Sequence, residues 1–161
     1  MKYILQISVL LFSVIIHEIA HGYVAYRRGD PTAKLMGRLT LNPVSHIDIF
    51  GSIILPLVLM ISGGPIFGWA KPVPVNPGRL NNPKTDMLWV SLAGCVANFL
   101  LAIIAAIGMA LIRKFATSDI SVLVTVYQIL QTVLIINIVV LILSTSRIDL
   151  IVKQFLSVNA T

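Results

Sequence analysis

Residues 3–26 read YILQISVLLFSVIIHEIAHGYVAY, an apolar run that contains the pattern His17-Glu18-Ile19-Ala20-His21. About 20 residues of helix cross the hydrocarbon core of a bilayer, so this run predicts a membrane-spanning helix. Residues four apart are neighbours on a helix, and His17 and His21 can therefore bind one metal ion through two ring nitrogens. Glu18 would lie near that ion, where its carboxylate can take a proton from water.

The composition supports a membrane protein with a single membrane-embedded core domain over residues 1–161. The chain is 57% hydrophobic and only 11% charged, which is typical of a protein whose solvent is the lipid bilayer. Its net charge is +6, but the basic residues cluster between apolar runs with no aromatic residues among them. We therefore expect topology signals rather than a nucleic-acid surface. Cys95 is the only cysteine, so a disulfide framework is excluded.

Two further runs, residues 87–112 and 120–146, contain no charged residue and predict spanning helices. Residues 49–62 are apolar but short, with Pro56 in the middle, and favour a re-entrant or interfacial element. Residues 63–86 are rich in Gly and Pro and predict an extended segment. The expected fold is an all-α membrane protein with three to four transmembrane helices and a re-entrant, extended Gly-Pro-rich element between the first and second long helices.

Charge favours three crossings over four. With four crossings, each side of the membrane carries six basic residues, whereas three crossings give a split of nine against three. The second arrangement obeys the positive-inside rule and places the motif near the cytoplasmic face of the cell (inner) membrane. It also puts Asp149 on the same face as His21, while four crossings would separate them by about 30 Å.

The metal hypothesis rests on the free-energy cost of placing ionisable side chains inside a membrane. An ionisable group within a membrane helix costs on the order of 3 kcal/mol on insertion scales, and a divalent cation would compensate His17, Glu18 and His21. The alternative is a polar cluster packed between helices. Two His and one carboxylate would leave a position open for water and substrate.

The third ligand is ambiguous in the sequence. Asp149 follows an apolar run and could return to the motif, or it could pair with Arg147 or Lys153. His46 and Asp48 form a competing source of a ligand. The remaining acids are less suited: Asp30 and Asp86 resemble solvated turn residues, and Asp119 would lie on the opposite face.

Asn98 is the one strongly polar residue on a stripe of small residues, which also contains Gly94, Ala102, Ala106 and Ala110. Such a stripe lets another helix approach closely. The Asn98 amide could stabilise developing negative charge on a carbonyl oxygen, as in an oxyanion hole. It could equally be a hydrogen-bonding contact between helices.

Four stretches of the chain resemble the site-2 protease family of intramembrane zinc metalloproteases. They are His17–His21, Leu41-Asn42-Pro43 continuing to Asp48, Phe67–Pro77, and Ala93–Asn98. The resemblance implies Zn²⁺ bound by the two His of the motif and an aspartate on a later helix, with Glu18 activating water. It also implies that Asn98 assists the substrate or the oxyanion, and that the substrate is a transmembrane protein. The third stretch indicates a small bacterial-type member, without a PDZ or CBS domain.

The sequence departs from the family pattern in two places. Cys95 stands where the family usually has proline, a change that is tolerable because proline takes no part in the chemistry. The family's Asn-Leu-Leu-Pro…Leu-Asp-Gly stretch here reads Leu143-Ser144-Thr145-Ser146-Arg147-Ile148-Asp149-Leu150. Two hypotheses follow. The chain is a zinc endopeptidase in which Asp149 completes the zinc site, or it is an inactive or truncated relative that acts as a membrane binding or scaffold protein. A transporter fragment, with Asn98, Gln128 and Asn137 along a path, is a weaker alternative.

Overall fold

The computed structural model describes residues 2–63, 71–115 and 121–158, and these ranges contain helices and no strand. In chain order the α-helices are α1 (Lys2–Arg27), α2 (Thr32–Leu35), α3 (Leu55–Ile61), α4 (Pro83–Phe115) and α5 (Ser121–Val158). Short 3-10 turns lie at Pro43–His46 and Pro77–Arg79, and a π-helix at Ile49–Ile54 precedes α3.

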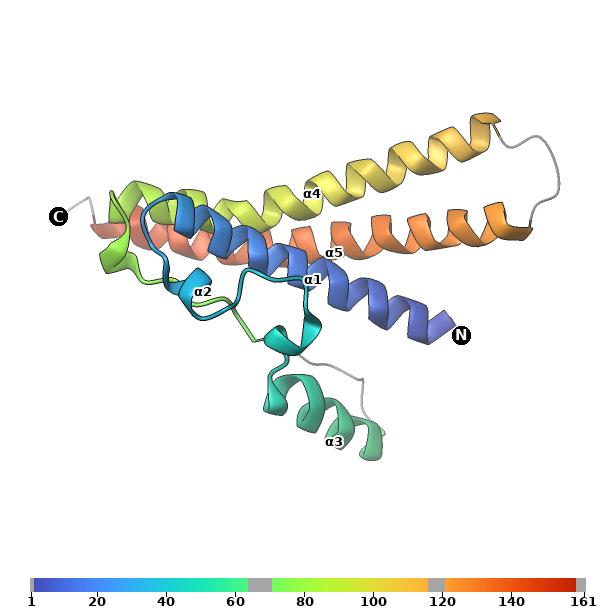
Figure 1. Cartoon of the computed structure of the whole chain (residues 1–161), viewed down its shortest axis with the longest axis horizontal. Helices are drawn as coiled ribbons and strands as arrows, with labels where there is room; N and C mark the ends of the chain where they lie inside the picture. Colours follow the sequence, from blue (N-terminus) through green and yellow to red (C-terminus); the bar gives the residue numbers. More distant parts are fainter. Residues whose placement is uncertain (1, 64–70, 116–120, 159–161) are drawn as a thin grey trace.

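Three helices are long and apolar enough to cross a membrane: Leu5–Arg27 of α1, Pro83–Lys114 of α4 and Leu123–Ser144 of α5. They confirm the all-α membrane fold and its three long helices. In Figure 1, α4 runs opposite to α1 and α5, so the C-terminal end of α5 returns to the end of the bundle where α1 ends. This order is the one expected for three crossings.

The interior of the bundle holds polar as well as apolar side chains, and many apolar side chains face outward. Ser13, Asn98 and Asn137 are almost completely buried, whereas Ile7, Ile104 and Ile142 are more than 60% exposed. Asn137 of α5 donates a hydrogen bond of 3.0 Å to the Ser13 hydroxyl of α1. Lipid surrounds apolar side chains without cost, and interhelical hydrogen bonds help hold such helices together.

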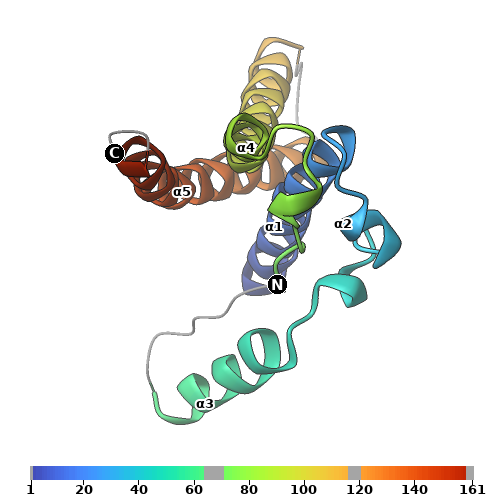
Figure 2. The ribbon, with the colours of Figure 1, turned by 90° about the vertical axis from the view of Figure 1, so that its left-hand side faces the viewer.

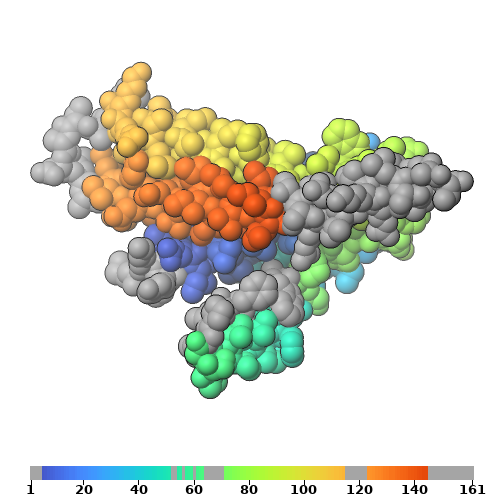
Figure 3. Space-filling model, turned by 180° about the vertical axis from the view of Figure 1, so that it is seen from behind, coloured from blue at the N-terminus to red at the C-terminus, as the bar shows by residue number. Residues whose placement is uncertain are grey.

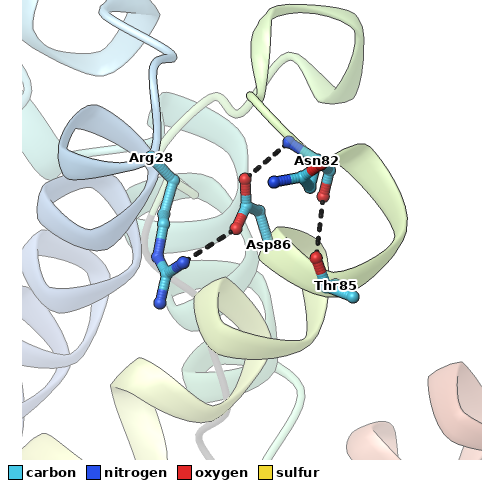
Figure 4. A network of polar contacts seen from close by, with 4 residues as sticks. All are labelled: Arg28, Asn82, Thr85 and Asp86. Carbon is cyan, nitrogen blue, oxygen red and sulfur yellow. Dashed lines mark hydrogen bonds and ion pairs between the residues drawn. The ribbon is translucent and has the colours of Figure 1, made fainter.

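Two aspartates lie near the ends of the connection between α1 and α4: Asp30 follows α1 and Asp86 is in the first turn of α4. Asp30 and Asp86 are 0% and 1% exposed, so their description as solvated turn residues is wrong. The guanidinium of Arg28 donates to Asp86 at 3.1 Å, and the backbone N–H of Asn82 donates to the same carboxylate at 2.8 Å (Figure 4). Asp86 thereby caps the first turn of α4 and ties it to the end of α1.

Residues 49–61 form a short arm. The π-helix continues directly into α3, and both views of the ribbon show α3 standing away from the three long helices (Figures 1 and 2). Seen from behind, the arm projects below the bundle (Figure 3). Several apolar side chains among those the structure describes here are exposed, with Ile49 70% and Ile61 85% exposed. The arm is too short to span a bilayer, and its entry into lipid stays a prediction.

Two other boundaries bear on the site. Of the extended segment predicted over residues 63–86, residues 71–76 are free of helix, whereas Pro77–Arg79 form a 3-10 turn and α4 already begins at Pro83; residues 64–70 lie outside the described part of the chain. The last helix was expected to end before Asp149, but α5 continues to Val158. Asp149 is therefore within the helix rather than beyond it. Its side chain is outside the described residues, as is Asp119.

Candidate metal centre

His17 and His21 meet on one face of α1. Their Nε2 atoms lie 3.0 Å apart, and the two rings are nearly perpendicular, with an interplanar angle of 83°. Two Zn–N bonds of about 2.0–2.1 Å at a tetrahedral angle would place the nitrogens roughly 3.3 Å apart. The pair is therefore close to the spacing at which both nitrogens bind one ion.

The other nitrogen of each ring faces a group on α4. Nδ1 of His21 lies 2.6 Å from the carbonyl oxygen of Val90. A carbonyl oxygen only accepts, so this Nδ1 carries a proton and Nε2 keeps the lone pair that a metal needs. Partners of this kind orient metal-binding histidines and raise their basicity.

Asn98 contacts His17 rather than an open space. Its side-chain Nδ2, which can only donate, lies 3.0 Å from Nδ1 of His17, and its Oδ1 is buried without a hydrogen-bond partner among the described residues. Turning the amide by 180° would place that oxygen against Nδ1, where it could accept the ring proton. In that orientation both rings would carry a proton on Nδ1, two lone pairs would converge between His17 and His21, and a cation would stabilise the arrangement.

Gly94 lets α4 approach the two rings. A Cβ atom on Gly94 would lie 2.5 Å from Nε2 of His21 and 2.6 Å from Nε2 of His17, closer than real Cβ atoms come to other heavy atoms. Val90, Gly94 and Asn98 are spaced four residues apart, so they share one face of α4. The part of the stripe from Gly94 to Asn98 therefore lies on the face that contacts the motif.

Glu18 points toward the extended segment. Its Oε2 accepts a hydrogen bond of 2.8 Å from the backbone N–H of Val73. The same segment is tied at both ends, because Lys71 N–H donates to the His46 carbonyl at 2.9 Å and Asn76 N–H donates to Asp30 at 2.6 Å.

The competing ligands are engaged elsewhere. His46 is fully buried, with Nε2 2.8 Å from the Thr40 carbonyl, and Asp48 accepts from the Gly51 N–H at 2.7 Å. Within the described ranges, no group of three His, Cys, Asp or Glu side chains could hold a metal ion. The described donor set is thus His17 and His21, which fits two of the positions of a zinc ion.

Backbone groups are what sequence reasoning missed here. The Val90 carbonyl and the Val73 N–H both contact the motif, and a peptide group is the same whatever its side chain. The only sequence signal was Pro72-Val73-Pro74, where two prolines leave one N–H in three residues.

Comparison with known proteins identifies relatives of this chain. The sequence model of Peptidase family M50 matches residues 5–158. Over 116 residues the chain is 44% identical to "Putative zinc metalloprotease YwhC" of Bacillus subtilis, covering 67% of this chain and 50% of that protein. It is 33% identical over 108 residues to "Putative zinc metalloprotease Rip2" of Mycolicibacterium smegmatis, covering 63% and 38%. No solved structure matches.

A match over nearly the whole chain, with the two His and Glu18 gathered on α1, identifies the protein class: this chain belongs to peptidase family M50, the site-2 protease family. The resemblance seen in the sequence is confirmed. The chain spans half the length of the Bacillus relative and 38% of the length of the mycobacterial one.

Proposed function

We propose that the chain is an intramembrane zinc metalloendopeptidase that hydrolyses a peptide bond of a membrane-spanning protein. The observation that carries the proposal is the convergence of two imidazole nitrogens at 3.0 Å beside a carboxylate, inside an apolar helix. The names of the relatives support zinc as the metal. His17 and His21 would hold the ion, and Asp149 is the proposed third ligand.

Zinc, when bound, supplies Lewis-acid chemistry: it polarises a carbonyl group and makes water more acidic. Glu18 acts as the general base that removes a proton from the attacking water, and then returns a proton to the leaving amine. The Val90 carbonyl accepts the Nδ1 proton of His21, and Asn98, with its side-chain oxygen turned toward the ring, would do the same for His17.

Asn98 has a second proposed role that the family resemblance suggests, at the substrate carbonyl. Its contact with His17 favours orientation of the ring, because an amide whose nitrogen or oxygen faces Nδ1 has only its other end available. The proposed location is the inner membrane, with the site near the cytoplasmic face, as the split of basic residues favours.

Glu18→Gln tests the function. The substitution removes the base and leaves both imidazoles, so we expect cleavage of a co-expressed membrane substrate to fall by at least about 100-fold. The zinc content of the purified protein should stay unchanged. Asp149→Ala is the companion variant, which should lose zinc and cleavage together.

A Glu18→Gln variant that cleaves as well as the unmutated protein would contradict the mechanism. Absence of zinc from the unmutated protein would instead favour the second function, a binding or scaffold protein. That alternative is motivated by the altered sequence around Asp149, where the family's proline and glycine are missing.

A further inference from the structure

Residues 71–76 lie along α1 as an extended strap, held through three of their backbone N–H groups. Lys71 donates to the His46 carbonyl, Val73 to Glu18, and Asn76 to Asp30. The middle contact is different in kind, because its acceptor is the side chain expected to act as the base. The outer two contacts are to groups remote from the histidine pair.

The composition of the strap leaves a single donor at its centre. Pro72 and Pro74 have no N–H, so Val73 is the only residue of the three that can donate a backbone hydrogen bond. Proline also fixes its own φ and restricts the preceding residue to extended conformations. The direction of the Val73 N–H is therefore set by its two neighbours.

The Val73 side chain anchors the donor. It is 8% exposed and packs over Gly22, where an added Cβ would lie 2.6 Å from Cγ1 of Val73 and 2.8 Å from Leu39. Gly22 follows His21 directly in the sequence. Close packing at this point fixes the distance between the strap and the motif on α1.

We propose that the Val73 backbone N–H is a positioning group that orients the Glu18 carboxylate for proton transfer. It binds Oε2 and leaves Oε1 as the oxygen that takes the proton from water. This inference rests on the proposed protease function. A base must lie within about 2.6–3.2 Å of the atom it deprotonates, and a misplacement of about 1 Å can cost roughly 100-fold in rate.

Amide hydrogen exchange tests the contact without any need for catalysis. Pro72 and Pro74 carry no amide hydrogen, so a peptide signal over residues 72–74 reports Val73 alone. We expect the Val73 amide to be protected in the unmutated chain and in Glu18→Gln, whose side chain keeps an acceptor oxygen. Glu18→Leu should exchange roughly tenfold faster or more, because its side chain has no acceptor.

The Lys71 amide is the internal control, since its acceptor is the His46 carbonyl. Faster exchange at Val73 with an unchanged rate at Lys71 supports the contact, whereas an equal increase at both amides reports general loosening of the strap and would count against it. An unchanged rate at Val73 in Glu18→Leu would overturn it.

Val73→Pro tests the catalytic consequence. Removing the N–H should lower kcat by about 10- to 100-fold while KM and zinc content stay within a few fold. Val75→Pro places the same ring two residues further along and should leave kcat near its normal value. Val73→Ala keeps the N–H but loses the packing that holds it, so it should lower kcat less than Val73→Pro does.

Equal loss of kcat in Val73→Pro and Val75→Pro, or no loss in either, would overturn the positioning role. The two proposals fail separately. If the unmutated chain cleaves no membrane substrate, the protease function fails, and with it any role in proton transfer, while the exchange experiment still decides the contact.

Discussion

His17, Glu18 and His21 each meet a group from another element of the fold. His21 faces the Val90 carbonyl, His17 faces Asn98, and Glu18 accepts from Val73. Ionisable side chains are expensive at membrane depth unless polar groups surround them. These partners also determine which ring nitrogen carries the proton, because a ring nitrogen that donates a hydrogen bond leaves the other nitrogen to bind a metal.

Gly94→Ala should disrupt the site from the side of α4. The new methyl group would lie 2.5–2.6 Å from both Nε2 atoms, so the rings or the helix must shift. We expect zinc affinity to fall at least about tenfold and the free energy of unfolding to fall by about 1–3 kcal/mol. Zinc titration and thermal unfolding of the purified protein would measure both.

Gly108→Ala is the matched control on the same helix. Its methyl group would meet Cδ1 of Leu130 at 2.9 Å, the end of a flexible side chain that can move. Zinc affinity should stay normal in this variant. Unchanged zinc affinity in Gly94→Ala would show that the close approach of α4 is not needed for metal binding.

At the scale of elements, the connection after α1 is organised by buried carboxylates. Asp30 accepts from the Thr32 N–H at 3.0 Å, from the Thr32 hydroxyl at 2.5 Å, and from Asn76 N–H at 2.6 Å. It thus joins the start of α2 to the end of the strap. Asp86 similarly joins Arg28, which follows α1, to Asn82 at the start of α4 (Figure 4).

The Asp30 carboxyl predicts a stability that depends on pH. Burial raises its pKa, but the hydrogen bonds from Thr32 and Asn76 outweigh burial, and the net pKa is lowered. A lowered folded-state pKa means that the contribution is complete above the unfolded value of about 3.9 and disappears as the pH falls through the folded value.

Asp30→Asn should therefore destabilise the protein by about 1–3 kcal/mol at pH 7, because one of the two acceptor oxygens is lost. The difference in melting temperature between the variant and the unmutated protein should shrink below about pH 4. A difference that stays constant down to about pH 3 would show that the ionised carboxylate is not what holds the strap.

At the scale of the whole molecule, α4 runs opposite to α1 and α5, so the C-terminal ends of α1 and α5 lie at the same end of the bundle (Figure 1). Arg79 and Lys84 then lie on the side where α1 ends, and Arg113 and Lys114 lie at the far end of α4. The nine-to-three split of basic residues predicts that the first side is cytoplasmic.

Cysteine labelling would test this orientation. In a Cys95→Ala background, Arg79→Cys should resist a membrane-impermeant thiol reagent in intact cells and react after permeabilisation. Lys114→Cys should react in intact cells. The reverse pattern would place the motif near the outer face, and labelling of both from one side would contradict three crossings.

Sequence alone determined the membrane class, the three long helices and the histidine pair, because each depends on residues close together in the chain. An apolar run of sufficient length is helical in lipid since its backbone has no other partner, and residues four apart always share a helical face. The extended strap followed from its prolines for the same local reason.

Only the tertiary structure decided which groups complete the site. Val90, Gly94 and Asn98 reach the motif from α4, and Val73 reaches it from the strap, through contacts between residues 55 to 81 positions apart. Asp30 and Asp86 became buried for the same reason. Two of these groups act through the peptide backbone and one through the lack of a side chain. Packing between distant segments gives such groups their role, and neither composition nor spacing records it.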